Sequence, residues 1–198
     1  MVTSKMLDNN IGYVAVYEFE ETTSEQFNQA IDELTAQGMK GLIIDLRDNP
    51  GGLVNSATAI LDRILSKDQL LVYTVDKNGK KQEEYTEDDE TINVPISVLI
   101  NGNSASASEI VSGCLQDYGK AKLVGTTSFG KGIVQYVLPL GDGSAIKLTS
   151  AKYYTPNGRN IHGTGIDPDV EVELNSDSET DTQLEKAQEI VLQEIQAE

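Results

Sequence analysis

The sequence predicts one α/β domain to which β-hairpins are added. Short apolar runs of strand length alternate with segments of helical periodicity along the 198 residues, as expected for a sheet covered by helices. The runs at 41–47 and 96–100 are almost continuously apolar, which is typical of strands buried on both faces. A chain of this length can bury one substantial core, so we expect a single globular unit.

The first half of the chain predicts two pairs of a strand followed by a helix. Residues 11–19 are predicted to be a strand, and the sequence T-S-E-Q at 23–26 matches a capping box that begins a helix. The buried strand at 41–47 leads into the loop sequence D-N-P-G-G at 48–52, and a second helix follows. The apolar faces of the two helices consist of Phe27, Ile31 and Leu34 in the first and Val54, Ala57, Ile60, Leu61, Ile64 and Leu65 in the second.

The second half predicts hairpins, one strand–turn–helix unit and a C-terminal helix. Asn78-Gly79 suits the positive φ of a tight turn and predicts a hairpin around it. The strand at 96–100 is followed by small and polar residues, and then by a helix from about Ser108 to Tyr118. The other expected elements are strands at 70–75, 123–126, 133–140 and 145–155 and an amphipathic helix from Asp181 that carries Leu184, Ala187, Val191 and Ile195.

The composition excludes several classes of protein. The chain has 15 Lys and Arg against 32 Asp and Glu, and its net charge of −17 argues against partners such as nucleic acid or an anionic membrane surface. One Cys and one His cannot form a disulfide, a Cys-rich zinc site or a metal site with two imidazoles, so no metal is expected. The acidic run at 83–90 is predicted to be a solvated loop, and the acidic residues after 166 a solvated tail. No run of 18 apolar residues and no signal peptide are present, which predicts a soluble chain, whole or excised from a longer protein.

Three serines lie where a nucleophile could sit. Ser104, Ser106 and Ser108 occupy the predicted turn between a buried strand and a helix. A hydroxyl there can project from the sheet edge, and N–H groups at the start of the helix can stabilise a developing oxyanion. The alternative is a helix cap built from small residues.

A nucleophilic serine needs a base, and Lys131 is the better of two candidates. His162 lies in a Gly-rich loop and is expected to face solvent. Lys131, between two glycines, could be drawn into a buried position that depresses its pKa. In an extended chain Gln135 would share a face with Lys131 and could orient its amine. The alternative is a surface lysine beside a strand glutamine. A phosphate-binding loop is rejected because Gly132 stands where that motif needs Ser or Thr.

Other reactive side chains have structural interpretations. Cys114 is expected to be a small buried thiol. Asp117, near the end of the same helix, is expected to make structural hydrogen bonds, although it could be a third catalytic acid. Asp45 and Arg47 flank a strand end and are expected to pair or to hold loops.

Four motifs in order resemble the catalytic core of carboxyl-terminal processing peptidases, also called tail-specific proteases. The motifs are DLRDNPGG at 45–52, NSASASEI at 103–110, LVGTTSFGKGIVQ at 123–135 and GTGIDPDVEV at 163–172. The resemblance covers roughly residues 6–173. It implies a serine endopeptidase with a Ser-Lys dyad on a crotonase-like (ClpP/crotonase-type) α/β fold, cleaving proteins near their C-termini through an acyl-enzyme, without a cofactor.

The resemblance also assigns residues. Ser106 matches the family's nucleophile, Lys131 the general base and Gln135 the residue that positions the lysine. The oxyanion hole resembles the N–H of Ala107 together with a glycine N–H of the Pro-Gly-Gly turn. Gly52 is the first choice for that glycine and Gly51 the second.

The expected organisation is a catalytic core at 1–173 and an acidic amphipathic helix or tail at 174–198. No segment like the PDZ domain that often precedes such cores is expected, which leaves open the alternative that the core is latent.

Protein or peptide substrates are the expected partners, and a homo-oligomer built through the C-terminal helix is a further alternative. The rival function is a non-catalytic binder of apolar ligands or peptides, as in the similar interphotoreceptor retinoid-binding repeats. The resemblance implies an extracytoplasmic location (periplasm, cell envelope or secreted).

Overall fold

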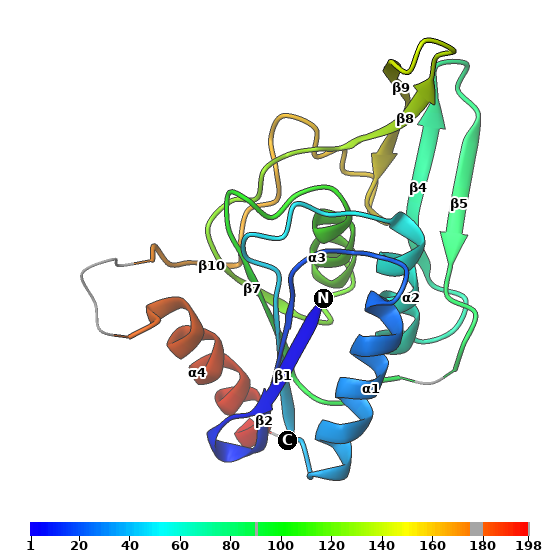
Figure 1. The fold of residues 1–198 in the computed structure, drawn as a ribbon. Coiled ribbons are helices and arrows are strands. Elements are labelled where there is room, and N and C mark those ends of the chain that lie inside the picture. Colours follow the sequence, from blue (N-terminus) through cyan, green and yellow to red (C-terminus); the bar gives the residue numbers. More distant parts are fainter. Residues whose placement is uncertain (90, 175–179, 198) are drawn as a thin grey trace.

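The computed structural model describes residues 1–89, 91–174 and 180–197 (Figure 1). Over these residues the fold consists of two sheets and four α-helices. The strands are β1 (Val2–Met6), β2 (Ile11–Val16), β3 (Gly41–Asp45), β4 (Leu70–Asp76), β5 (Lys81–Tyr85), β6 (Ile96–Ile100), β7 (Lys122–Gly125), β8 (Ile133–Pro139), β9 (Ala145–Tyr154) and β10 (Val170–Glu171). The helices are the 3₁₀-helix η1 (Asp8–Asn10) and the α-helices α1 (Thr23–Ala36), α2 (Val54–Ile64), α3 (Ala107–Asp117) and α4 (Thr182–Ala197).

The larger sheet confirms the α/β prediction. Its strand order is β1-β2-β3-β6-β7-β10, and all neighbours are parallel except β1, which pairs antiparallel with β2. Every residue of β3 and β6 is buried, as their continuous apolar runs predicted. Leu42 and Ile44 face the core under α1, α2 and α3, whereas Ile43 faces the core under α4. Helices therefore cover both faces of the sheet.

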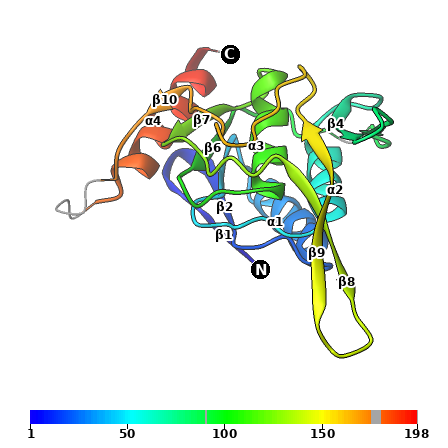
Figure 2. The same cartoon turned by 90° about the horizontal axis from the view of Figure 1, so that it is seen from above.

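The smaller sheet joins the hairpin predicted around Asn78-Gly79 to a second hairpin, β8–β9, of which the sequence predicted the two strands. Its order is β5-β4-β9-β8 with antiparallel pairing, and the turn between β4 and β5 contains Gly79 with φ of 81°. The pairing of β4 with β9, which joins the two hairpins, was not predicted. The β8–β9 hairpin projects away from the body of the molecule (Figure 2).

The structure differs from the prediction near the N-terminus. Residues 2–6 form the unpredicted strand β1, and β2 ends at Val16 rather than continuing to residue 19. The capping box predicted at Thr23 is wrong, because Thr22 is the N-cap. The Thr23 hydroxyl donates to the Glu18 carbonyl and accepts the Glu20 N–H, so it holds the loop before the helix instead of the helix end.

The acidic C-terminal helix is present and packs on the sheet. Ala187 and Val191 of α4 are fully buried against Ile43 and Leu99, so α4 is a structural layer and not a solvated tail. The predicted acidic loop is also shorter than expected, because Glu83 and Glu84 belong to β5; Glu90 lies outside the described residues. Among the described helices none is long and apolar enough to cross a membrane.

Candidate active site

Only one of the three serines in the NSASAS turn has an accessible side chain. Ser104 and Ser108 are fully buried, and their hydroxyls donate to the backbone carbonyls of Leu46 (2.7 Å) and Asn49 (3.0 Å). Both therefore hold the turn against the loop after β3. Ser106, between them, is partly exposed. This burial pattern leaves Ser106 as the candidate nucleophile.

The backbone of Ser106 is strained. Ser106 is the N-cap of α3 and has φ of 56° and ψ of −112°, a conformation that residues other than glycine rarely adopt. Its carbonyl accepts a hydrogen bond from the Tyr153 hydroxyl at 3.1 Å. Burial, and the nearby Glu109 carboxylate, raise the pKa of Tyr153, so the phenol stays protonated and keeps donating. The strain is thus held by the surrounding structure, as at other strand-to-helix turns that present nucleophiles.

Glu109 joins the serine turn to the lysine loop, a role that the sequence analysis missed. Its carboxylate is fully buried and accepts four hydrogen bonds. The backbone N–H groups of Ser106 and Lys131 both donate to Oε2 at 2.8 Å, while the Ser128 hydroxyl (2.5 Å) and the Gly130 N–H (2.7 Å) donate to Oε1. One carboxylate oxygen therefore bridges the backbones of the two predicted catalytic residues. The pattern S-x-x-E at 106–109, a capping-box signature, was the available signal.

Glu109 joins the backbones of Lys131 and Ser106, but their side chains make no bond to each other. Over the described ranges no hydrogen bond or ion pair holds the Lys131 ammonium, and none joins it to the Ser106 hydroxyl. The lysine loop is fixed through its glycines, because a Cβ at Gly130 or Gly132 would lie 2.8 Å or 2.7 Å from backbone atoms of the 161–165 loop. The backbone of the lysine loop is thus fixed, whereas the lysine side chain has no polar partner among the described residues.

Gln135 lies on β8 but does not contact Lys131 through a hydrogen bond. Its amide donates to the Thr149 hydroxyl on β9 at 3.3 Å, directly across the ladder. The expectation that Gln135 and Lys131 share a face assumed one extended strand through both residues. However, β8 begins at Ile133, so Lys131 lies before the strand and outside its alternation of faces. The role of Gln135 in orienting the lysine stays a prediction.

Two backbone N–H groups, one in the serine turn and one in the Pro-Gly-Gly turn, have no acceptor among the described residues. One belongs to Ala107, the first residue of α3, and the other to Gly52, whose neighbours make the bridge to Phe19. The N–H of Gly51, by contrast, donates to the Asn49 side chain at 2.9 Å. Gly51 has φ of 106°, and a Cβ there would lie 2.7 Å from the Ser106 Cβ. Glycine is thus required for the close approach, and Gly52 is the one with a free donor.

Asn49 organises the contact between the Pro-Gly-Gly turn and the serine turn, although the sequence pattern did not predict a role for it. It is fully buried, and its side chain donates to the Val16 carbonyl at 2.8 Å and accepts the Gly51 N–H. Its carbonyl accepts the Ala105 N–H (3.0 Å) and the Ser108 hydroxyl. The Pro-Gly-Gly turn and the serine turn are therefore held together by one residue.

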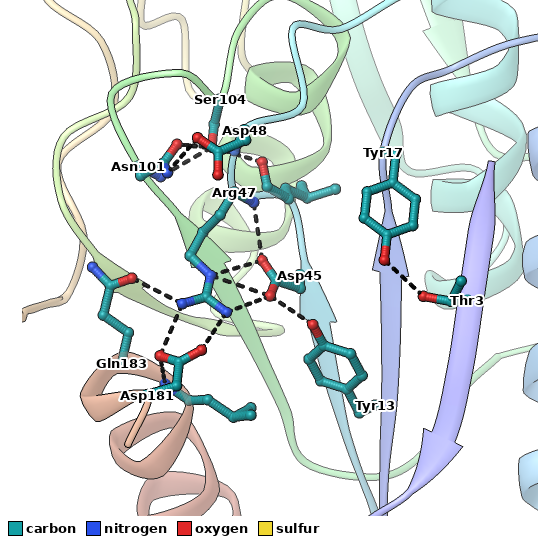
Figure 3. A network of polar contacts seen from close by, with 12 residues as sticks. Thr3, Tyr13, Tyr17, Asp45, Arg47, Asp48, Asn101, Ser104, Asp181 and Gln183 are labelled. Carbon is teal, nitrogen blue, oxygen red and sulfur yellow. Dashed lines mark hydrogen bonds and ion pairs between the residues drawn. The ribbon is translucent and has the colours of Figure 1, made fainter. Parts of the chain in front are cut away.

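Arg47 and Asp45 pair, as predicted, and they also anchor α4 (Figure 3). The Arg47 guanidinium contacts Asp45 at 2.6 Å and Asp181 at 2.8 Å, and Tyr13 donates to Asp45 at 2.8 Å. Burial disfavours the charged guanidinium, but its hydrogen bonds with Asp45 and Asp181 outweigh this and raise the pKa of Arg47. Arg47 also donates to Gln183 at 3.1 Å, so the end of β3 and the start of α4 are tied together.

The remaining reactive side chains occupy structural or peripheral positions. Asp117 pairs with Arg159 and accepts the Asn157 N–H at 2.8 Å, which supports a structural role. His162 is exposed, and Cys114 is fully buried, which raises the pKa of its thiol. The described residues contain no group of three or more His, Cys, Asp or Glu side chains arranged to hold a metal ion.

An accessible serine on a strained strand-to-helix turn is how many α/β hydrolytic enzymes present a nucleophile. The fold and the serine turn therefore place the chain among the α/β hydrolytic enzymes, and comparison with known proteins identifies its family. Residues 10–172 match peptidase family S41, and the chain belongs to that family.

Individual relatives agree with this membership. The chain is 42% identical over 168 residues to the carboxy-terminal processing protease CtpB of Bacillus subtilis, covering 85% of this chain and 35% of that protein. It is 44% identical over 176 residues to the carboxy-terminal-processing protease of Bartonella bacilliformis, covering 84% of this chain and 40% of that protein. Among solved structures, the photosystem II D1 C-terminal processing protease is 30% identical with a TM-score of 0.78, covering 96% of this chain and 52% of that one. This chain thus spans well under half the length of the two curated relatives, and the structural match agrees with the expected ClpP/crotonase-like core.

Proposed function

We propose that this chain is the catalytic core of a serine endopeptidase of the carboxyl-terminal processing type, with Ser106 as nucleophile and Lys131 as general base. The observation that carries the proposal is the Glu109 carboxylate, which bridges the backbones of these two residues. Membership of family S41 and the relatives' names support a protein or peptide as the substrate.

In the proposed reaction the neutral Lys131 amine takes the Ser106 proton as Oγ attacks the scissile carbonyl. The tetrahedral intermediate collapses, the C–N bond breaks, and the lysine returns that proton to the leaving amine. Water then attacks the acyl-enzyme and gives a proton to the lysine. As the C–Oγ bond breaks to release the carboxylic acid, the lysine passes this proton to Oγ, which restores both the serine and the free amine. These steps require the Lys131 amino group to reach Ser106, and no described group bonds it elsewhere.

The oxyanion is stabilised in this proposal by the N–H groups of Ala107 and Gly52. Both lack protein acceptors in the described structure, and Ala107 lies at the N-terminus of α3, where the helix dipole favours negative charge. Gly51, the second choice, does not offer its N–H, because that group donates to the Asn49 side-chain oxygen. Its role is to let the Pro-Gly-Gly turn approach Ser106 closely.

Cleavage of an unstructured protein substrate tests the proposal. Ser106→Ala and Lys131→Ala are each expected to reduce kcat/KM by at least about 10³-fold, because each removes one half of a unit that acts together. Ser4→Ala, at an exposed position on β1, is the matched serine control and is expected to retain cleavage. A Ser106→Ala protein that cleaves as fast as the parent would overturn the assignment of Ser106, and a parent protein that binds the substrate without cleaving it would favour the ligand-binding alternative.

We also infer from the family resemblance that the protein acts outside the cytoplasm. Fractionation of cells that produce the full-length protein tests this location, and recovery in the cytoplasmic fraction alone would contradict it.

A further inference from the structure

A groove runs from the vicinity of Ser106 to the β4–β5 hairpin. It lies between α2, α3 and the smaller sheet and has a volume of about 490 Å³, within the range of ligand-binding pockets. Tyr153 and Ile110 line its near end. The Tyr153 hydroxyl donates to the Ser106 carbonyl at 3.1 Å, and the Ile110 backbone N–H donates to the same carbonyl at 3.0 Å. The groove therefore begins beside the backbone of the candidate nucleophile.

The walls of the groove and its hairpin side differ in chemistry. The walls are largely apolar and include Val54, Val72, Val134 and Ala151. The hairpin side has two carboxylates, Asp76 on β4 and Glu84 on β5, which lie on either side of the Thr74–Gln82 pair. Among the described residues no Lys, Arg or His lines the groove. The groove is therefore complementary to a ligand with an apolar stem and a positive charge.

The strand register separates these groove-facing acids from the other charges of the hairpin. Val72 is paired with Glu84 and Thr74 with Gln82, so these residues share the face toward the groove. Lys81 and Glu83 alternate onto the opposite face, where they form an ion pair at 2.6 Å beside the Tyr73 ring. Glu84 makes no ion pair with any described residue.

Asp76 is held in its charged form. Its carboxylate accepts the Lys80 and Asn78 N–H groups of the hairpin turn, at 2.9 Å and 2.8 Å, and these bonds lower the pKa of Asp76. Lys80 lies behind it in the turn and adds a smaller effect in the same direction. Burying an apolar segment against two carboxylates would cost desolvation without a compensating charge.

We propose that this groove binds the substrate segment next to the scissile bond and selects a basic side chain through Asp76 and Glu84. The inference rests on the proposed peptidase function and adds a substrate preference to it. Lysine or arginine would lay its methylene stem along the apolar walls and place its cation near Gln82, between the two carboxylates.

Paired peptides test the preference. Each pair is identical except for Lys or Met, which have similar stems, at one of the three positions on the acyl side of the scissile bond. The parent protein is expected to cleave the Lys peptide with about tenfold higher kcat/KM at one of these positions. Glu84→Gln is expected to reduce that ratio about threefold, and Asp76→Asn likewise, since the asparagine oxygen can still accept the turn N–H groups.

Glu83→Gln is the matched control, because it removes the same charge from the same strand on the opposite face. It is expected to leave the Lys-to-Met ratio unchanged. Equal cleavage of both peptides at all three positions, or an equal effect of Glu83→Gln and Glu84→Gln, would overturn the inference.

Binding to the Ser106→Ala protein separates this inference from the proposed function. Fluorescence anisotropy is expected to show tighter binding of the labelled Lys peptide than of the Met peptide, and Glu84→Gln should weaken that preference. Preferential binding with no cleavage by the parent would reject the peptidase proposal and support the groove. Cleavage or binding without discrimination, or no binding of either peptide, would reject the groove.

Discussion

Replacement of Glu109 by Gln probes the link between the serine turn and the lysine loop. The carboxylate accepts four hydrogen bonds, two on each oxygen, from donors of two different loops. The amide keeps one oxygen and places an NH₂ group where the other oxygen was. That group can donate to the Ser128 hydroxyl but not to a backbone N–H, so at least one buried N–H loses its acceptor.

The expected cost follows from these bonds. A hydrogen bond to a charged group contributes about 1.5–3 kcal/mol, a neutral one about 1 kcal/mol, and a buried unpaired donor costs about 1–3 kcal/mol. Glu109→Gln should therefore lower the free energy of unfolding by about 3–5 kcal/mol, measured by urea denaturation. Domains of this kind are stable by about 5–15 kcal/mol, so the variant should still fold at low temperature.

The activity of the folded variant distinguishes positioning from stability alone. A displacement of the serine or lysine backbone by about 1 Å can cost about 10²-fold in rate, so kcat should fall by that order while KM changes little. The control is Glu189→Gln, an exposed carboxylate on α4. A Glu109→Gln protein within about 1 kcal/mol and threefold of the parent in stability and kcat would refute the proposed role of Glu109.

Four further results are expected. Burial opposes the charge of Asp181, but the hydrogen bond to Arg47 outweighs it and lowers the pKa of Asp181 below the usual 3.8. The stabilisation by Asp181 is thus complete above about pH 4 and is lost as pH falls through the folded-state pKa. Urea denaturation between pH 2 and 6 should show that the free energy of unfolding of Asp181→Asn depends less on acid than that of the parent. An unchanged dependence would contradict the pairing. Cys114 should react with a thiol reagent only after unfolding, because it is buried and its pKa is raised; rapid labelling of the native protein would show otherwise. Val191→Ala should lower the free energy of unfolding by about 2 kcal/mol in a denaturation experiment, and a change below about 0.5 kcal/mol would mean that α4 does not pack on the sheet. His162→Ala should change kcat/KM by less than about twofold, and a large loss in the peptide assay would make His162 part of the reaction.

Elements that are determined by local pattern could be predicted from the sequence. The continuous apolar runs of β3 and β6 specified buried strands, and Asn78-Gly79 specified the β4–β5 turn. The apolar spacing of α4 specified an amphipathic helix, although the charge around it suggested a solvated tail. Its packing on Ile43 depends on a face of the sheet that only the complete fold creates.

The candidate site was predictable in its residue types but not in its connections. Ser106 could be chosen among three serines by resemblance, whereas the structure shows the physical reason: the hydroxyls of Ser104 and Ser108 are buried in backbone hydrogen bonds. Glu109 and Asn49 were missed because their partners lie far away in the sequence. A buried side chain that joins distant loops leaves no periodic signal along the chain.

Covalent labelling with a fluorophosphonate tests the central claim most directly. Such a probe reacts with a serine hydroxyl that is activated by a base and releases fluoride. Peptide mapping by mass spectrometry is expected to find one adduct on Ser106 of the parent protein and none in a folded Lys131→Ala variant. An adduct on another serine, or equal labelling of Ser106 without Lys131, would contradict the assignment of the Ser106–Lys131 pair.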